Sequence, residues 1–525
     1  MKNVIIYDAT LRDGMQGIEV SYTLEDKIQI AHMLDDLNVD YIEGGFPRSN
    51  QKEAAFFSRV KDERFSHAKI VAFGSTRKAG HDAAEDSGIN ALLKTETDTV
   101  IVVGKAWKDH VKHVLKTDNS ENLDMIAESV DYLKSCGREV FLDLEHFFDG
   151  YKDDHEYAVE ILTRATQAGA DTLILCDTNG GTLPHDVAAI MQDLPMDELA
   201  PLGVHFHNDS GTADANTLAG IRNGAMHAQG TVNGWGERCG NANLCVFVPN
   251  LCLKTRYSVN MGSQLEHLTS LSRFVAEKAN IIPNKRQPYV GEAAFSHKGG
   301  QHADVISKAD HLMEHIDSSL VGNERRIILS ELAGKSTIVT KIARYGSYEK
   351  NSAVVARLLD ILKEKERNGY EYEAAEASFD LIMRKCLDQY SPLFTLNNYH
   401  LESYKTGDLP SKTIGRIFLS HEQKQIMGAG VGVGPVETLD MCIRDALLPL
   451  NPFLSEIHLI DYRVRVLNPE AAAASKVRVF ITSTDNERSW DTVGVSENIV
   501  EASWEAIVDS FEYYYNNYTL DDDSA

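Results

Sequence analysis

The feature that most constrains the fold of this chain is the alternation of short apolar runs with helical periodicities over its first half. The apolar runs have the length of buried strands: Val4–Tyr7, Tyr41–Glu43, Ile70–Phe73, Thr99–Val103, Val140–Leu144, Thr172–Cys176, Gly203–Phe206 and Ala228–Thr231. Between them lie stretches with the 3.6-residue period of amphipathic helices, such as Leu24–Leu37, Asn122–Ser135, Glu156–Ala168 and Ala213–Asn223. Because parallel strands need crossover connections, usually helices, this alternation predicts a parallel sheet.

Eight such units within about 250 residues are typical of a TIM barrel. No G-x-G-x-x-G follows the first apolar run, which disfavours an open dinucleotide-binding sheet. We therefore expect an α/β fold with an N-terminal TIM (β/α)8 barrel over residues 1–270, which would be the catalytic domain.

The second half of the chain changes character. Residues 271–400 are mainly helical in pattern and predict helical linker subdomains, although the pattern thins out over residues 393–412. Residues 410–517 predict a C-terminal α+β domain, and residues 518–525 an acidic tail. The expected strands and helices of this domain are Ile414–Leu419, Ile457–Val466, Val477–Thr482, Glu437–Leu448 and Glu497–Tyr515. Gly428–Gly434 reads as a glycine-rich turn.

Composition excludes several classes of protein. The 525-residue chain has a formal net charge of -26, so nucleic acid and anionic membrane are not expected partners. Its seven cysteines include no CxxC pair, which disfavours a disulfide framework or a thiolate zinc site and fits a reducing compartment. No apolar run approaches transmembrane length, and a strand is expected too early for a signal peptide. We expect a cytoplasmic protein.

Polar side chains gather where the expected strands end. They are Arg12, Asp13, Glu43, Arg77, Glu145, His146, Asp177, Thr178, His205, His207, Asn233, Glu237, Arg238 and Asn241. In a barrel all these positions converge on the C-terminal rim, where barrel enzymes place their sites.

Four of these residues predict a metal site. His205 and His207 are two apart on a strand and so point to the same face. With Asp13 they form a two-histidine, one-carboxylate set with open coordination positions, and Asn241 is expected on the same rim. The alternative is a pair of rim histidines with ordinary hydrogen bonds. The ligand types do not choose among magnesium, manganese, zinc and cobalt.

Three further rim residues are candidates for substrate chemistry. Arg12 is suited to polarise a carbonyl oxygen, or else to form a structural ion pair. Thr178 is suited to donate to a substrate carboxylate, or else to cap a turn. Glu145 is expected to bind a substrate hydroxyl, to orient water or to pair with Arg12.

Two glycine-containing loops carry the remaining candidates. Gly234–Asn241 follows the eighth run, and its glycines allow a backbone to approach a ligand closely. Outside the barrel, His302 with Asp304 nearby resembles an oriented general base, although a solvated loop without function is the alternative.

The segments Asp8–Gln16, His205–Asp209 and Gly236–Asn241 together resemble the DRE-TIM metallolyase superfamily. Within it the chain is similar to the Claisen-condensing branch of citramalate, 2-isopropylmalate and homocitrate synthases. Four further segments resemble the bacterial citramalate synthase group: Tyr41–Gly45, Glu145–Lys152, Arg286–Gly291 and Val493–Ile499.

This resemblance implies a reaction and a role for most of the candidates. Acetyl-CoA, the co-substrate, would lose a methyl proton to His302, and its enolate would add to the ketone of a 2-oxo acid before hydrolysis releases CoA. A divalent metal would chelate the 2-oxo acid, Arg12 would polarise its carbonyl, Thr178 would anchor its carboxylate and Glu145 would assist. The implied metal ligands are Asp13, His205, His207 and Asn241.

The resemblance also implies a homodimer, in which the linker region of one subunit covers the barrel of the other, and an amino-acid effector at the C-terminal domain. Three features depart from the family pattern. Gln301 and Asp304 flank His302 where citramalate synthases usually have other residues, Met313 replaces a usual tyrosine, and Ala471–Ala474 replaces a glycine-rich turn of the regulatory domain.

Our leading hypothesis is condensation of acetyl-CoA with pyruvate to citramalate, in isoleucine biosynthesis. The alternatives within the branch are 2-isopropylmalate synthase, acting on 2-oxoisovalerate in leucine biosynthesis, and an enzyme for another 2-oxo acid, such as homocitrate synthase. A metal-dependent aldolase or lyase, and an amino-acid sensor with an inactive barrel, are alternatives of other classes.

Overall fold

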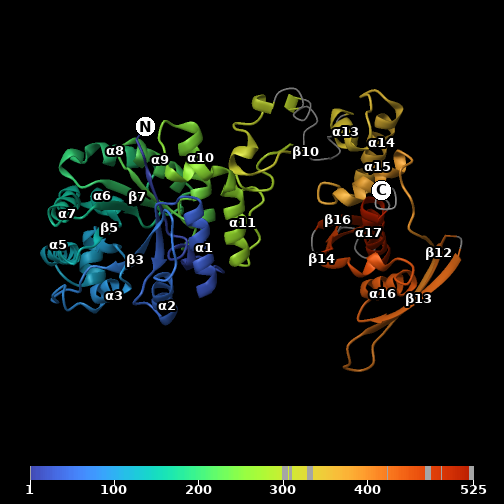
Figure 1. Cartoon of the computed structure of the whole chain (residues 1–525), viewed down its shortest axis with the longest axis horizontal. Helices are drawn as coiled ribbons and strands as arrows, with labels where there is room; N and C mark the ends of the chain where they lie inside the picture. The colour runs from blue at the N-terminus through green and yellow to red at the C-terminus, as the bar shows by residue number, and fades with distance from the viewer. Residues whose placement is uncertain are drawn as a thin grey trace. The chain divides into compact units, whose positions relative to one another are not determined.

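The computed structural model describes residues 2–297, 305–306, 310–327, 335–422, 424–467, 475–485 and 488–519. The chain divides into two compact units, Met1–Phe295 with Ile316–Arg325 and Ser296–His315 with Arg326–Ala525 (Figure 1). His302 and Ala471–Ala474 lie outside the described residues, as does most of the expected acidic tail.

The first unit is built on a closed barrel of eight parallel strands in sequence order, as predicted. The strands are β1 (Ile5–Asp8), β2 (Tyr41–Gly45), β3 (Lys69–Ser75), β4 (Thr99–Lys105), β5 (Glu139–Glu145), β6 (Thr172–Asp177), β7 (Leu202–Phe206) and β8 (His227–Gly230). The barrel closes where β1 pairs with β8, in a register that places Ile5 beside His227. Every strand overlaps the apolar run that predicted it.

Helices follow the strands, and all except the three-residue α4 pack their apolar faces against the outside of the barrel. They are α1 (Leu24–Asp36), α2 (Gln51–Val60), α3 (Ser87–Thr95), α4 (Lys108–His110), α5 (Asn119–Ser135), α6 (Phe147–Asp153), α7 (His155–Gln167), α8 (Pro184–Asp193), α9 (Ala213–Arg222), α10 (Leu244–Lys254) and α11 (Leu268–Lys278). Their starts have local causes: Thr23 and Asp26 form a capping box before α1, and Pro184 occupies the first turn of α8.

The second unit begins with short strands and helices. Strand β9 (Ser296–His297) pairs in parallel with β10 (Arg326–Ile327). The helices α13 (Lys335–Ile342), α14 (Ala353–Arg367) and α15 (Glu376–Cys386) follow. Their buried faces share an apolar cluster that includes Ile338, Leu358 and Phe379.

The rest of the second unit contains two three-stranded antiparallel sheets, each packed against one helix. The first is β11 (Thr395–Tyr404), β12 (Lys412–His421) and β13 (Lys424–Gly432) with α16 (Pro435–Leu447). The second is β14 (His458–Val466), β15 (Val477–Thr484) and β16 (Ser489–Ser496) with α17 (Ile499–Tyr514). This confirms the predicted α+β character of the C-terminal part.

One local prediction for this part was wrong. Gly428–Gly434 is not mainly a turn, because most of it belongs to β13, whose glycines let α16 approach closely: a Cβ on Gly428 would collide with the carbonyl oxygen of Cys442. The helical pattern thins out over residues 393–412, and this stretch contains β11, a largely exposed strand that pairs with β12.

No helix within the described ranges is long and apolar enough to cross a membrane.

Candidate active site

Three of the predicted metal ligands meet at the C-terminal rim of the barrel. Asp13 follows β1, His205 lies in β7, and His207 follows that strand directly. The Nε2 atoms of His205 and His207 are 3.3 Å apart, and they lie 3.3 and 3.8 Å from Oδ2 of Asp13. All three side chains are buried, and their ligand atoms are close enough to bind one ion.

Several buried polar atoms here have no hydrogen-bond partner. They are Oδ1 of Asp13, Nδ1 of His207 and Oδ1 of Asn241. Asn241 pairs with the backbone of His207 through an antiparallel bridge, and its Nδ2 donates to the carbonyl oxygen of Trp235 at 3.2 Å. Because an unpaired buried acceptor costs free energy, these oxygens fit a cation that is bound by carboxylate, imidazole and amide groups.

A hydrogen-bonded chain behind His205 fixes the direction of its ring. Nδ1 of His205 lies 2.8 Å from Oε1 of Gln229, whose Nε2 donates to Oδ1 of Asp143 at 3.1 Å. Since the amide oxygen can only accept, Nδ1 carries a proton, and Nε2, which faces Oδ2 of Asp13, is the nitrogen that can bind a metal ion. Burial raises the pKa of Asp143 to about 7. Sequence reasoning missed both residues, although Asp143 is a polar residue in the middle of a mainly apolar strand.

The electrostatics of the cluster keep Asp13 ionised. Burial raises the pKa of Asp13, but the positive Arg12 and the hydrogen bond to His205 outweigh burial and hold that pKa below its usual range. Burial lowers the pKa of His205, but the bond to Asp13 and its charge raise it overall. Burial and the charge of His205 lower the pKa of His207 to about 4.

Arg12 is held rigidly beside this cluster. Its Nε and Nη2 donate to the two carboxylate oxygens of Glu43 at 2.9 and 3.1 Å, and its guanidinium lies 3.9 Å from the centre of the Phe73 ring. Its Nη1 lies 3.6 Å from Oδ2 of Asp13. Burial opposes the charge, but Glu43 and Asp13 raise the pKa of Arg12 overall, so it remains a cation.

The other two rim candidates lie close to each other. Glu145 forms an ion pair with Lys105, whereas Arg12 pairs with Glu43, so the expected alternative of a Glu145–Arg12 pair is wrong. Oγ1 of Thr178 accepts a hydrogen bond from the backbone amide of His146 at 2.8 Å, which leaves the hydroxyl proton free to be donated.

A cavity of about 290 Å³ joins these groups. The predicted residues that line it are Arg12, Asp13, Glu145, Thr178, His205 and His207. Its wall holds two cations, Arg12 and Lys105, beside the carboxyl groups of Asp13, Asp143, Glu145 and Glu237. With a divalent cation bound by Asp13, His205 and His207, the positive charges of Arg12 and Lys105 would help to hold a small anion here.

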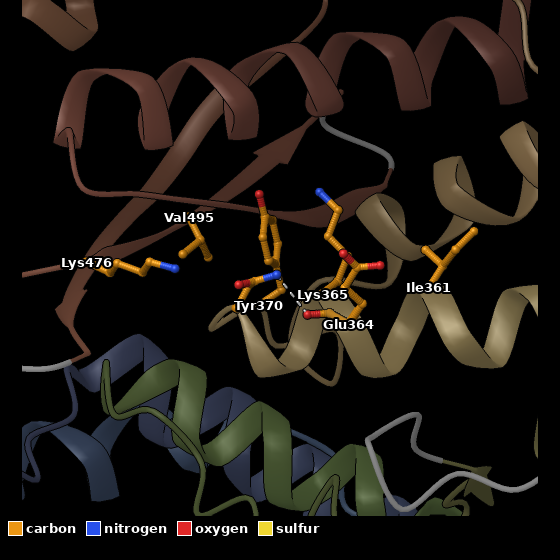
Figure 2. Close-up of a pocket in the computed structure, with 7 residues that line it drawn as sticks. Ile361, Glu364, Lys365, Tyr370, Lys476 and Val495 are labelled. Carbon is orange, nitrogen blue, oxygen red and sulfur yellow. Dashed lines mark hydrogen bonds between the residues drawn. The ribbon is translucent and has the colours of Figure 1, made fainter.

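A second cavity, of about 370 Å³, lies within the second unit (Figure 2). Its lining comes from α14, the turn after it and the neighbouring strands: Ile361, Glu364, Lys365, Asn368, Tyr370, Lys476 and Val495. The hydroxyl of Tyr370 donates to Glu505 at 2.7 Å, and the amine of Lys365 lies 3.5 Å from that carboxylate. Two polar groups of this cavity, Tyr370 and Lys365, therefore already interact with Glu505 of the same unit.

Family models match almost the whole chain. The HMGL-like model covers residues 3–275, the homocitrate synthase post-HMGL domain-like model residues 289–368, and the LeuA allosteric (dimerisation) domain residues 373–515.

Curated relatives match over nearly their full length. The (R)-citramalate synthase of Aquifex aeolicus is 46% identical, and that of Geobacter sulfurreducens is 44% identical; each alignment covers 98% of both chains. A probable 2-isopropylmalate synthase of Methanopyrus kandleri is 30% identical over 96% of this chain and 97% of its own.

Proposed function

We propose a role for each residue of the barrel cavity on the premise that the chain belongs to the citramalate synthase family. The chain is an acyltransferase that condenses acetyl-CoA with pyruvate to give citramalate and free CoA. One observation supports assigning this activity to the cavity. Buried oxygen atoms of Asp13 and Asn241 that lack hydrogen-bond partners lie in the same cluster as His205, His207 and Arg12.

Asp13, His205, His207 and Asn241 would hold a divalent cation, whether magnesium, manganese, zinc or cobalt. The bound ion supplies Lewis acidity toward the ketone and carboxylate of the 2-oxo acid. Gln229 keeps His205 in the tautomer that such a ligand needs, since its Oε1 accepts a hydrogen bond from the Nδ1–H group.

Arg12 donates to the ketone oxygen, where negative charge develops as the new carbon–carbon bond forms. Glu43 accepts from Nε and Nη2 and so fixes the guanidinium, while Nη1 faces the cluster. Thr178 donates its hydroxyl proton to the substrate carboxylate, and Lys105 adds positive charge to the wall. These contacts position a small 2-oxo acid with its ketone toward Arg12.

The base is proposed from the family resemblance alone, because His302 lies outside the described residues. His302 would take a methyl proton from acetyl-CoA, the enolate carbon would bond to the ketone carbon, and the resulting alkoxide would gain a proton. Glu145 would orient the water that then cleaves the thioester and releases CoA.

The domain organisation is part of the proposal. Residues 1–270 form the catalytic barrel domain, residues 271–400 the linker subdomains, residues 410–517 the regulatory domain and residues 518–525 the acidic tail. The match of residues 373–515 to an allosteric domain supports regulation by an end-product amino acid.

A homodimer is supported by the first C-terminal sheet. The cross-strand partners Phe418 and Met427, and likewise Ile414 and Val431, are exposed on β12 and β13, on either side of the exposed Arg416. These four apolar side chains are called the apolar stripe. Exposed apolar side chains of this kind are stabilised by burial against another protein surface. Because residues 373–515 match a dimerisation domain, we infer that this surface belongs to a second copy of the chain.

The decisive experiment measures CoA release from acetyl-CoA with a panel of 2-oxo acids and one divalent metal at a time. Pyruvate should give the highest kcat/KM. Preference for 2-oxoisovalerate would replace the proposal with 2-isopropylmalate synthesis, and no release with any 2-oxo acid would refute condensation. Removal of metal with a chelator should abolish release, and adding the metal back should restore it.

A further inference from the structure

A second group of metal-ligand side chains lies at the rim, apart from Asp13, His205 and His207, and shares only Glu145 with the lining of the cavity. His110 ends α4, and Glu145 and His146 come at the end of β5. Each offers a ligand atom, and these atoms all lie within 4.8 Å of one another. All three residues are half-buried. Two imidazoles with one carboxylate are a ligand set that zinc and similar ions bind.

His146 is oriented as metal-binding histidines usually are. Its Nδ1 lies 2.8 Å from Oδ2 of Asp149, and the same oxygen accepts from Nδ2 of Asn179 at 2.9 Å. Because the carboxylate holds the proton on Nδ1, Nε2 of His146 is left with its lone pair. Its backbone has a φ of 58°, an uncommon left-handed conformation, and its backbone amide donates a hydrogen bond to Oγ1 of Thr178.

His110 provides the second imidazole. Its ring stacks on Trp107 with centroids 5.5 Å apart, and its centroid is 4.3 Å from that of His146. Nδ1 of His110 is buried and has no hydrogen-bond partner. A buried nitrogen without a partner costs free energy unless a ligand binds it, and it is the second observation that favours an ion here.

Lys105 is the group that opposes such an ion. Its ammonium pairs with Glu145, so an incoming cation must displace it and must overcome its repulsion. This second site should therefore bind more weakly than the site at Asp13, where Oδ1 of the carboxylate lacks a partner.

We propose that His110, Glu145 and His146 form a second divalent-cation site, selective for ions that prefer imidazole, such as Zn²⁺, and that its occupation inhibits the enzyme. Binding needs only the three side chains. Inhibition rests on the proposed function, because the ion would withdraw Glu145 from the cavity where that residue orients water.

Binding is tested by the number of Zn²⁺ ions per chain after metal-stripped full-length protein is dialysed against Zn²⁺. Wild type should bind two. His110→Phe, which keeps a ring against Trp107 but removes both nitrogens, should bind one. His113→Phe, a matched change at an exposed histidine three residues on, should bind two. One ion in wild type, or two in His110→Phe, would overturn the site.

A second variant tests the site in case His110→Phe loses the ion only because it folds incorrectly. Asp149→Asn keeps all three ligands but removes the carboxylate behind His146, and it should weaken the second ion about 10- to 100-fold. Unchanged affinity in Asp149→Asn would contradict the orienting role of Asp149 on which the site depends.

Inhibition is tested by CoA release at a fixed activating metal concentration with added Zn²⁺. Wild type and His113→Phe should lose activity as the second ion binds, and His110→Phe should resist over the same range. Equal inhibition of all three would refute the inhibitory role. If no variant releases CoA, the proposed function fails, while ion counting still decides whether the second site exists.

Discussion

At the barrel rim polar atoms are buried without partners, whereas on the C-terminal sheets large apolar side chains are exposed. Oδ1 of Asp13 and Oδ1 of Asn241 lack hydrogen bonds, while Met427 is 55% and Val431 54% exposed. Both arrangements cost free energy in the isolated chain. The costs would be offset by different partners, a cation with its substrate at the rim and a protein surface at the sheet.

The largest effect is expected at the barrel rim, from the loss of a metal ligand. His207→Ala removes a metal ligand and should lower kcat by roughly 10³-fold or more, because Lewis-acid stabilisation is worth several kcal/mol. CoA release and bound metal should fall together. His185→Ala, at an exposed histidine of α8, should leave both unchanged. Full turnover by a metal-free His207→Ala would contradict the metal assignment.

A smaller effect is expected one step behind the ligands. Gln229→Met keeps a side chain of similar length but cannot accept from Nδ1 of His205. Metal affinity should fall about 10- to 100-fold, since partners behind a histidine ligand set its tautomer and direction. A competition titration with a chelating dye measures it, and Gln192→Met, at an exposed glutamine on α8, is the matched control.

The sheet half of the comparison is tested by charge. Phe418→Lys would place an ammonium within the apolar stripe and should weaken dimerisation by at least about 2 kcal/mol, roughly 30-fold in Kd. Sedimentation velocity over a concentration series measures this change. Ile282→Lys, at a residue 86% exposed outside the sheets, should not shift the equilibrium. An unchanged dimer in Phe418→Lys would place the interface elsewhere.

The smallest effect concerns a buried polar group that is satisfied. Burial raises the pKa of Glu512 to about 7, although the backbone amide of Leu393 donates to it at 3.1 Å. The unfolded carboxyl ionises first, near pH 4.5, so the stability of this unit should fall as pH rises from about 4.5 through 7. Activity with saturating metal should not depend on this group.

Glu512→Gln should remove that slope and, above pH 7, stabilise the unit by on the order of 1 kcal/mol. Hydrogen exchange of α17 at several pH values measures the change. The exposed Glu456→Gln on the same unit should keep the wild-type slope, and a pH slope retained in Glu512→Gln would assign it to other groups.

The barrel was predictable because its signals are local. Apolar runs and helical periodicity identify strands and helices without knowledge of their neighbours, and strand order follows from the requirement for crossovers. The C-terminal sheet of β11, β12 and β13 was harder to predict, because its signals depend on contacts between residues distant in sequence. Gly428 lies in a strand where its lack of a Cβ lets Cys442 on α16 approach closely, a contact that no local pattern reveals.

The residues of the active site likewise fall into those that local sequence signals predict and those that they do not. Asp13, His205 and His207 could be predicted because each ends a strand and strand ends share one rim. Gln229 and Asp143 lie within strands and act through one another across 86 residues, so only the three-dimensional register joins them. The pairing of Arg12 with Glu43 rather than Glu145 was decided by side-chain geometry that the sequence does not specify.

The pairing of β1 with β8 has a consequence for biosynthesis. The amide of Val232 donates to Thr10 across 222 residues, so the first strand leaves the ribosome long before the last. At translation rates of about 5–20 residues per second, β1 waits roughly 10 to 45 s for its second neighbour. Until then the nascent chain carries two unsealed strand edges, and Asp13 on one side of the seam gains His205 and Asn241 only in the last moments of barrel assembly.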